Sequence, residues 1–249
     1  MSLPEITLAQ AVGRQYRVTM RTLGVSFYRN LIFLEICFCL LSFFTFPTYG
    51  TFINQIFRLQ VLRFNDALPL WIGLLYVTAM AWLLADNRQR SCAFTFVSNR
   101  LSHNLANIAT LATMSAIASL LGTLSMVFVR VSAALWSRQT VVFWNGFRYT
   151  PHDLLTCVLA IFGYTFLCAA LCYLFVIGLR RCPKLLALIV PLTMFLGLRV
   201  NLVGEALATV LVFFITEGNI IIFTMKTLIT AALLFGAACW GSQRLEVRR

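Results

Sequence analysis

The chain has 249 residues, of which 60% are hydrophobic and only 11% charged, and its mean hydropathy is +0.86. An average soluble domain carries about 25% charged residues. These values exclude a disordered chain, a soluble enzyme and a disulfide-stapled secreted domain, and they predict an all-α, polytopic helical membrane protein. The formal net charge is +12, so the next question is where the cations lie along the chain.

The N-terminal segment 6–29 is predicted to form an amphipathic helix that lies flat on the inner leaflet. Leu8, Val12, Tyr16, Leu23 and Phe27 share one helical stripe. A second stripe carries the cations Arg14, Arg17 and Arg21. An apolar face beside a basic face is what an interfacial helix needs in order to bind anionic lipid headgroups.

The apolar segments that follow are each about long enough to cross a bilayer, which takes roughly 20 residues. Six spans are predicted, at 31–49, 67–85, 105–129, 154–179, 185–203 and 220–241. Between the last two, segment 204–219 is predicted to be a re-entrant or outer-side element, because short apolar pieces alternate there with charge. A count of seven spans remains open.

The cations are distributed unequally between the two sides that six spans would define. One side carries Arg14, Arg17, Arg21, Arg29, Arg88, Arg90, Arg100, Arg180, Arg181, Lys184, Arg244, Arg248 and Arg249. The other carries only Arg58, Arg63, Arg130, Arg138, Arg148 and Arg199. The positive-inside rule therefore predicts that both termini are cytoplasmic. The excess of basic residues is then explained by membrane topology and does not require a nucleic-acid partner. The role of the outer arginines stays open.

Sequence motifs for catalysis, nucleotide binding or metal binding were not found. The chain has no P-loop, no G-x-S-x-G and no H-E-x-x-H, and its two histidines and eight cysteines show no zinc-ligand spacing. We therefore expect no catalytic residues, no metal and no cofactor bound by this chain. Three ionisable residues in or beside apolar runs are candidates for a substrate pathway: Glu35, Glu205 and Lys226. For Glu35, expected near the inner headgroups, a structural ion pair with a loop arginine is the alternative.

The cytoplasmic segment 91–101 is predicted to form a short helix that docks a partner. It has an apolar centre and ends in a Ser-Asn-Arg turn into the next span. Its candidate docking residues are Cys92, Phe94, Phe96, Val97, Ser98, Asn99 and Arg100.

This layout resembles that of type-2 ABC transporter permeases, in particular the small permeases of bacterial antibiotic, bacteriocin and lipid exporters. The local likeness lies in Ser91–Arg100, where an aromatic run, a small-residue turn and an arginine follow one another. The resemblance implies an exporter subunit of the bacterial cytoplasmic membrane that pairs with a second copy or a sister permease. A separate ATPase subunit would bind ATP and magnesium and contact segment 91–101.

Two other functions remain open at this level. The chain could be a membrane-embedded assembly or immunity component that transports nothing, or a lipid-modifying enzyme using Glu35 or Glu205 as acid or base. An importer is disfavoured, because the later cytoplasmic loop Arg180–Lys184 is too short for a docking helix. The substrate cannot be read from the sequence.

Overall fold

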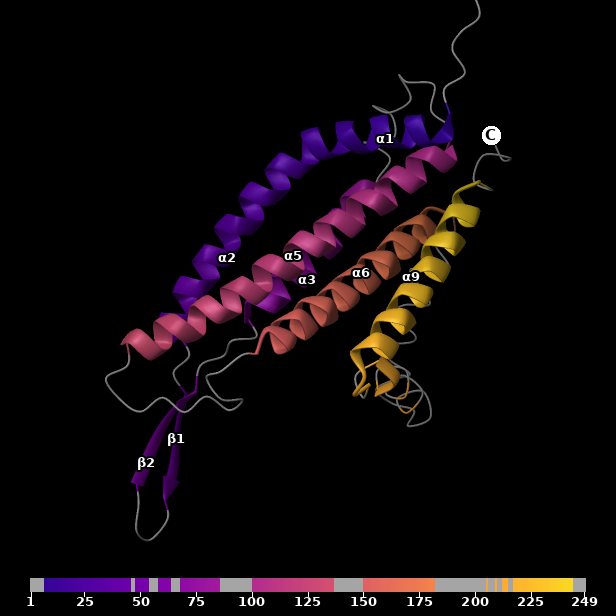
Figure 1. Ribbon diagram of the computed structural model, residues 1–249. Helices are drawn as coiled ribbons and strands as arrows, with labels where there is room; N and C mark the ends of the chain where they lie inside the picture. The colour runs from indigo at the N-terminus through magenta and orange to yellow at the C-terminus, as the bar shows by residue number, and fades with distance from the viewer. Residues whose placement is uncertain are drawn as a thin grey trace, which may run out of the picture.

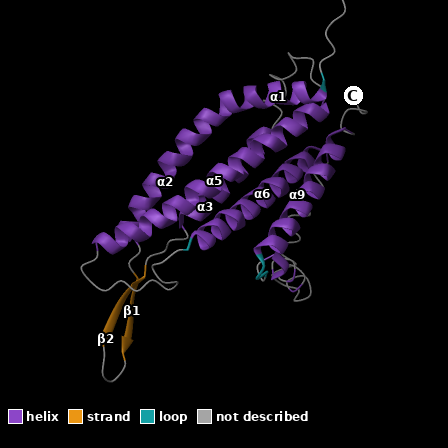
Figure 2. Cartoon of the chain, in the orientation of Figure 1, coloured by secondary structure: helices purple, strands orange, loops and turns teal. Residues whose placement is uncertain are grey.

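The computed structural model describes residues 7–45, 48–53, 58–63, 68–85, 100–136, 150–181, 205, 209, 212–214 and 217–243. Long helices lie side by side, and a β-hairpin projects from one end (Figure 1). Outside this hairpin the regular structure of the described residues is helical (Figure 2).

Seven helical elements are bounded in this part of the chain: α1 (Leu8–Thr19), the π-helix η1 (Met20–Gly24), α2 (Val25–Thr45), α3 (Leu68–Ala85), α5 (Arg100–Trp136), α6 (Pro151–Arg181) and α9 (Ile220–Gln243). Four helices are long and apolar enough to cross a membrane, at Leu8–Leu41, Leu101–Ser132, Pro151–Leu179 and Ile220–Ser242. A shorter apolar helix covers Leu70–Ala85. The prediction of a helical membrane protein is confirmed at this level.

The helices run along a common direction, so the bundle has two distinct ends. The termini end holds the start of α1 and the end of α9, and the hairpin end lies opposite (Figure 1). α5 runs from the termini end to the hairpin end beside α1 and α2. α3 runs antiparallel to α5, because Leu84 lies near Asn107 and Leu70 near Gly122. α6 and α9 run parallel to each other, from the hairpin end to the termini end.

The first helix differs from the predicted interfacial helix followed by a separate span. α1, η1 and α2 form one continuous helix that changes direction near the π-turn, and α1 contacts α5. Residues 8–45 contain no proline to stop the helix, and a π-turn is a common cause of a bend. The expected helix over 6–29 is therefore present, but it is packed against the bundle.

The hairpin corrects the all-α prediction. β1 (Thr48–Ile53) pairs antiparallel with β2 (Arg58–Arg63), with Thr48 opposite Arg63 and Ile53 opposite Arg58. The span predicted at 31–49 thus ends as a helix at Thr45, because Pro47 cannot continue the helix. Threonine, aromatic and β-branched residues after Pro47 favour extended backbone.

Four of the remaining predicted spans are described and helical, and one lies outside the described residues. Segments 67–85, 105–129, 154–179 and 220–241 are helical, and α5 extends beyond 105–129 at both ends. α6 begins with a capping box, in which Thr150 and Asp153 each accept the other's backbone N–H, and Pro151 takes the first helical position. The span at 185–203 and residues 91–99 lie outside the described residues, as does most of segment 204–219.

The core lies where α3, α5, α6 and α9 meet. Large side chains such as Leu111, Tyr173 and Phe235 alternate there with alanines, including Ala81, Ala118, Ala169 and Ala170. Because lipid is as apolar as leucine, small residues that let helices approach closely are what favours packing in a membrane. The closest approach involves Gly163 of α6, where an added Cβ would lie 2.9 Å from Phe223 Cε1 and 3.1 Å from Thr227 Oγ1.

We predict opposite effects from one substitution at two helical glycines. Gly163→Ala forces α6 away from α9 and should lower the thermal unfolding midpoint of the detergent-solubilised protein. Gly236→Ala is the matched control, because nothing lies within 4 Å of its added Cβ. Alanine is favoured over glycine in a helix by about 1 kcal/mol, so Gly236→Ala should leave the midpoint unchanged or raise it. Equal midpoints for the two variants would contradict the close α6–α9 contact.

Candidate functional site

A buried polar network joins the helices at the termini end. The Tyr173 hydroxyl on α6 donates to Asn104 Oδ1 on α5 at 3.1 Å and accepts from Asn107 Nδ2 at 3.4 Å. Asn104 Nδ2 in turn donates to Ser242 Oγ on α9 at 2.8 Å, and Asn107 Nδ2 also points to the Leu84 carbonyl oxygen on α3 at 3.4 Å. The side chains of Tyr173, Asn104, Asn107 and Ser242 are all buried.

A second arm of the network reaches α1 through His103. Gln15 Nε2 lies 3.1 Å from His103 Nδ1, and Asn107 Nδ2 lies 3.4 Å from His103 Nε2. A neutral imidazole has one donor and one acceptor. Asn107 Nδ2 carries two hydrogens and lies 3.4 Å from three acceptor groups, the Leu84 carbonyl oxygen, the Tyr173 hydroxyl and His103 Nε2, so it donates to two of them at a time. On the other side of Gln15, Ser102 Oγ donates to Gln15 Oε1 at 3.5 Å.

This network connects α5 to every helix around it at the termini end. Its members come from α1, α3, α5, α6 and α9, and four of them stand in the first two turns of α5. Buried polar groups are costly when they lose their partners, so such a network holds the helices in one relative position. Arg100, the first residue of α5, lies immediately before it.

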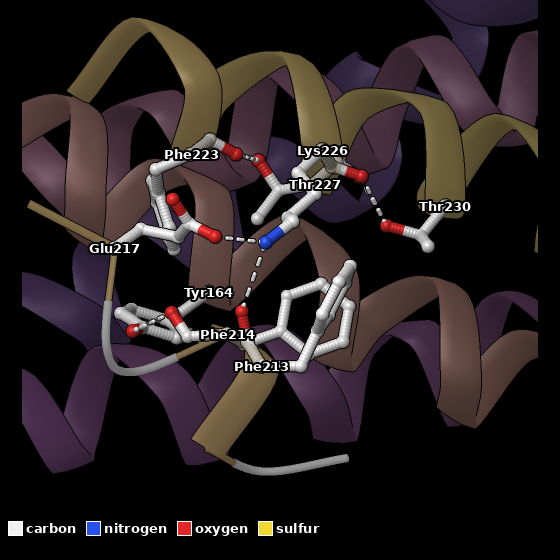
Figure 3. Close-up of polar contacts among 8 residues, drawn as sticks. All are labelled: Tyr164, Phe213, Phe214, Glu217, Phe223, Lys226, Thr227 and Thr230. Atoms are coloured by element: carbon white, nitrogen blue, oxygen red, sulfur yellow. Dashed lines mark hydrogen bonds and ion pairs between the residues drawn. The ribbon is translucent and has the colours of Figure 1, made fainter. Parts of the chain in front are cut away.

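Lys226 lies in the second turn of α9, which begins at the hairpin end (Figure 1). Figure 3 shows its contacts with Glu217 and Phe213. Its ammonium group pairs with the Glu217 carboxylate, donates to the Phe213 carbonyl oxygen at 3.1 Å, and lies 3.4 Å from the centre of the Phe213 ring. The two charged side chains are 19% and 25% exposed. An ion pair with this little solvent depends on both partners, because either charge alone would be poorly solvated.

Two further contacts involve residues 212–214 and 217–219. Tyr164 on α6 donates through its hydroxyl to the Phe214 carbonyl oxygen at 3.1 Å, and Asn219 Oδ1 accepts the Ile221 backbone N–H at 3.0 Å, which caps α9. An open cavity of about 210 Å³ lies beside these residues. Its lining includes His152, Thr156, Tyr164, Glu217 and Phe223.

Glu35 lies on α2 and faces α5. Its side chain is 3% exposed, and neither carboxylate oxygen has a hydrogen-bond partner among the residues that the structure describes. Ser125 of α5 and Cys39 of α2 are its polar neighbours. Ser125 is 22 residues beyond His103 on α5, which is about 33 Å along the helix axis. The helix that carries Glu35 begins at Leu8 and not at Leu31, and the expected position of Glu35 near the inner headgroups stays a prediction.

The predicted pathway residues do not form one site. Glu35 faces α5, whereas Lys226 lies on α9, at the other edge of the layer of helices (Figure 1). Lys226 pairs with Glu217, which the sequence did not single out as a partner, and Glu205 is exposed. The interfacial cations Arg14, Arg17 and Arg21 are exposed on the first helix. Among the candidate docking residues only Arg100 is described, while Cys92, Phe94, Phe96, Val97, Ser98 and Asn99 lie outside the described residues.

Sequence reasoning missed the network, although part of its signal was present. Asn104 and Asn107 are three residues apart at the start of an apolar helix, where two buried amides require partners. Their partners Tyr173 and Ser242 are distant in sequence, so only the fold identifies them.

No group of three or more metal-binding side chains occurs among the described residues. Comparisons of the chain with protein-family models, with curated proteins and with solved structures found no match.

We predict that the Lys226–Glu217 pair is energetically coupled. Lys226→Met leaves the Glu217 carboxylate half-buried without its cation and should lower the free energy of unfolding by about 1–3 kcal/mol. Adding Glu217→Gln removes that unpaired charge, so the double variant should lose less than the sum of the two single losses. The exposed residue Glu205 supplies the control Glu205→Gln, expected to change stability by no more than about 0.5 kcal/mol. Additive losses would show that the pair contributes nothing.

Proposed function

We propose that this chain is the membrane subunit of an ABC exporter. It would form the substrate pathway with a second copy or a sister permease, and a separate ATPase subunit would supply ATP hydrolysis. The proposal starts from the resemblance of the chain's layout to small exporter permeases. The structural observation that supports it best is the buried network at the start of α5, which follows segment 91–99 in the sequence.

The network gives the proposed docking segment a mechanical connection to the bundle. A partner that moves segment 91–101 would also move the first turns of α5, which follow it without a break in the sequence. Those turns are bonded through Asn104, Asn107 and His103 to α1, α3, α6 and α9. Since each buried bond is costly to break, a displacement of α5 is shared with these helices. A transporter driven by an external ATPase needs such a connection.

The directions of the helices support six crossings. α6 ends at the termini end, and α9 begins at the hairpin end (Figure 1). The chain between them therefore starts at one end of the bundle and finishes at the other, which favours the crossing expected at 185–203. In this topology the termini and segment 91–101 share one side. The excess of arginine on that side makes it the cytoplasmic side by the positive-inside rule, where ATP is available.

Two variants should separate the binding of the ATPase subunit from the coupling between that subunit and the helix bundle. Phe96→Asp places a charge in the proposed docking segment and should abolish co-purification of the ATPase subunit. Tyr173→Phe keeps that segment intact but removes the hydroxyl between Asn104 and Asn107. It should therefore retain the ATPase, while the stimulation of ATP hydrolysis by the membrane subunit falls several-fold.

The matched control is Tyr164→Phe, which removes a hydroxyl from the same helix, α6, outside the network. It should keep both the ATPase and its stimulation. The measurements are affinity purification in mild detergent and ATP hydrolysis by the complex in lipid vesicles. If the wild-type chain purifies without an ATPase, the exporter proposal fails and a non-transporting assembly or immunity role is favoured. If Phe96→Asp still holds a fully stimulated ATPase, the docking segment is assigned wrongly.

A further inference from the structure

Glu35 occupies a position where the helix pattern calls for an apolar residue. Along the first helix the buried positions are Gly24, Phe27, Leu31, Glu35 and Cys39. Their spacing of three or four residues makes one stripe on the helix. The burial of Glu35 therefore follows from the packing of α2 on its neighbours and does not depend on one flexible rotamer.

Among the described residues, the helices packed around Glu35 offer its charge no counterion. α3, which packs on α2, contains no charged residue. On α5 the nearest neighbour is Ser125, and the only cation on the hairpin half of that helix is Arg130, more than one turn beyond Ser125. On α2 itself the adjacent ionisable group is the Cys39 thiol. Both carboxylate oxygens are sealed from solvent and have no hydrogen-bond partner among the described residues.

In these surroundings the ionised form of the Glu35 side chain is energetically unfavourable. A charged side chain at membrane depth is expensive, and a buried one that lacks a counterion neutralises itself when it can. Both oxygens are closed to bulk solvent. A proton removes the charge, and the neutral carboxyl then needs only one acceptor for its O–H, for which the Ser125 hydroxyl on α5 is the neighbouring group.

We propose that Glu35 is a proton-binding site inside the bundle, occupied whenever α2 packs on α5 as it does here. Separation of the two helices would hydrate the carboxyl and release its proton, so movement of α2 is linked to proton release. This inference stands on the packing of α2 alone and is independent of the proposed exporter function.

Infrared difference spectroscopy of the full-length protein in phosphatidylcholine vesicles at neutral pH reads the protonation state directly. A neutral carboxyl shows a carboxylic C=O stretching band, which a carboxylate lacks. The spectrum of wild type minus Glu35→Gln should contain this acid band. Glu205→Gln is the matched control, because Glu205 is exposed, and its difference spectrum should contain carboxylate bands. Carboxylate bands alone in the Glu35→Gln difference would overturn the proposal.

Stability supplies a second, independent readout. Glutamine is a neutral isostere of a protonated glutamate, so Glu35→Gln should accumulate in the membrane and unfold at the wild-type temperature or above. Leu31→Gln, one turn earlier on the same buried stripe, buries a new amide and should unfold at a lower temperature. If Glu35→Gln fails to accumulate, or is destabilised as strongly as Leu31→Gln, then Glu35 carries a needed charge and the proposal is wrong.

Discussion

The hydrogen bonds between Tyr173 and the two amides of α5 set the arrangement of the helices at the termini end. Tyr173 is fully buried and reaches across from α6 to α5. Hydrophobic burial does not hold helices together inside a lipid bilayer, so close packing and polar contacts between helices must do so. The positions of α3 and α9 follow from the same centre, because Asn107 reaches Leu84 and Asn104 reaches Ser242.

The two ends of the bundle are fastened by different chemistry. The termini end uses neutral amides and hydroxyls, most of them buried. The hairpin end uses one ion pair and one aromatic ring, with Lys226 between Glu217 and Phe213. Between the ends the described contacts are mainly apolar or involve small hydroxyl residues, and Glu35 is a buried acid among them.

Much of the fold could be predicted from the sequence because hydropathy acts locally. The helices α3, α6 and α9 closely match runs bounded by charge or by proline, such as the start of α6 at Pro151. The errors arose where no local signal marks a boundary. No proline lies between Thr19 and Val25, so the first helix continues where two elements were expected. No Asn-Gly or Asp-Gly turn marks the hairpin after Pro47, so its two strands were not predicted.

The candidate sites were less predictable because their partners meet only in the folded chain. Lys226 stood out as a cation in an apolar run, yet its pairing with Glu217 depends on the fold of residues 217–219. Glu35 stood out as a buried acid, but its depth could not be judged without knowing that the helix begins at Leu8. The network residues Asn104 and Tyr173 are 69 positions apart, and neither is unusual alone.

A double-mutant cycle between Asn104→Ala and Tyr173→Phe tests the central role of this contact most directly. The free energy of unfolding would be measured for wild type, both single variants and the double variant in mixed micelles. Polar contacts between membrane helices average about 0.6 kcal/mol and reach about 1.7 kcal/mol. If the network sets the helix arrangement, the coupling energy should lie in the upper part of that range. Additive single losses, with a coupling energy near zero, would contradict it.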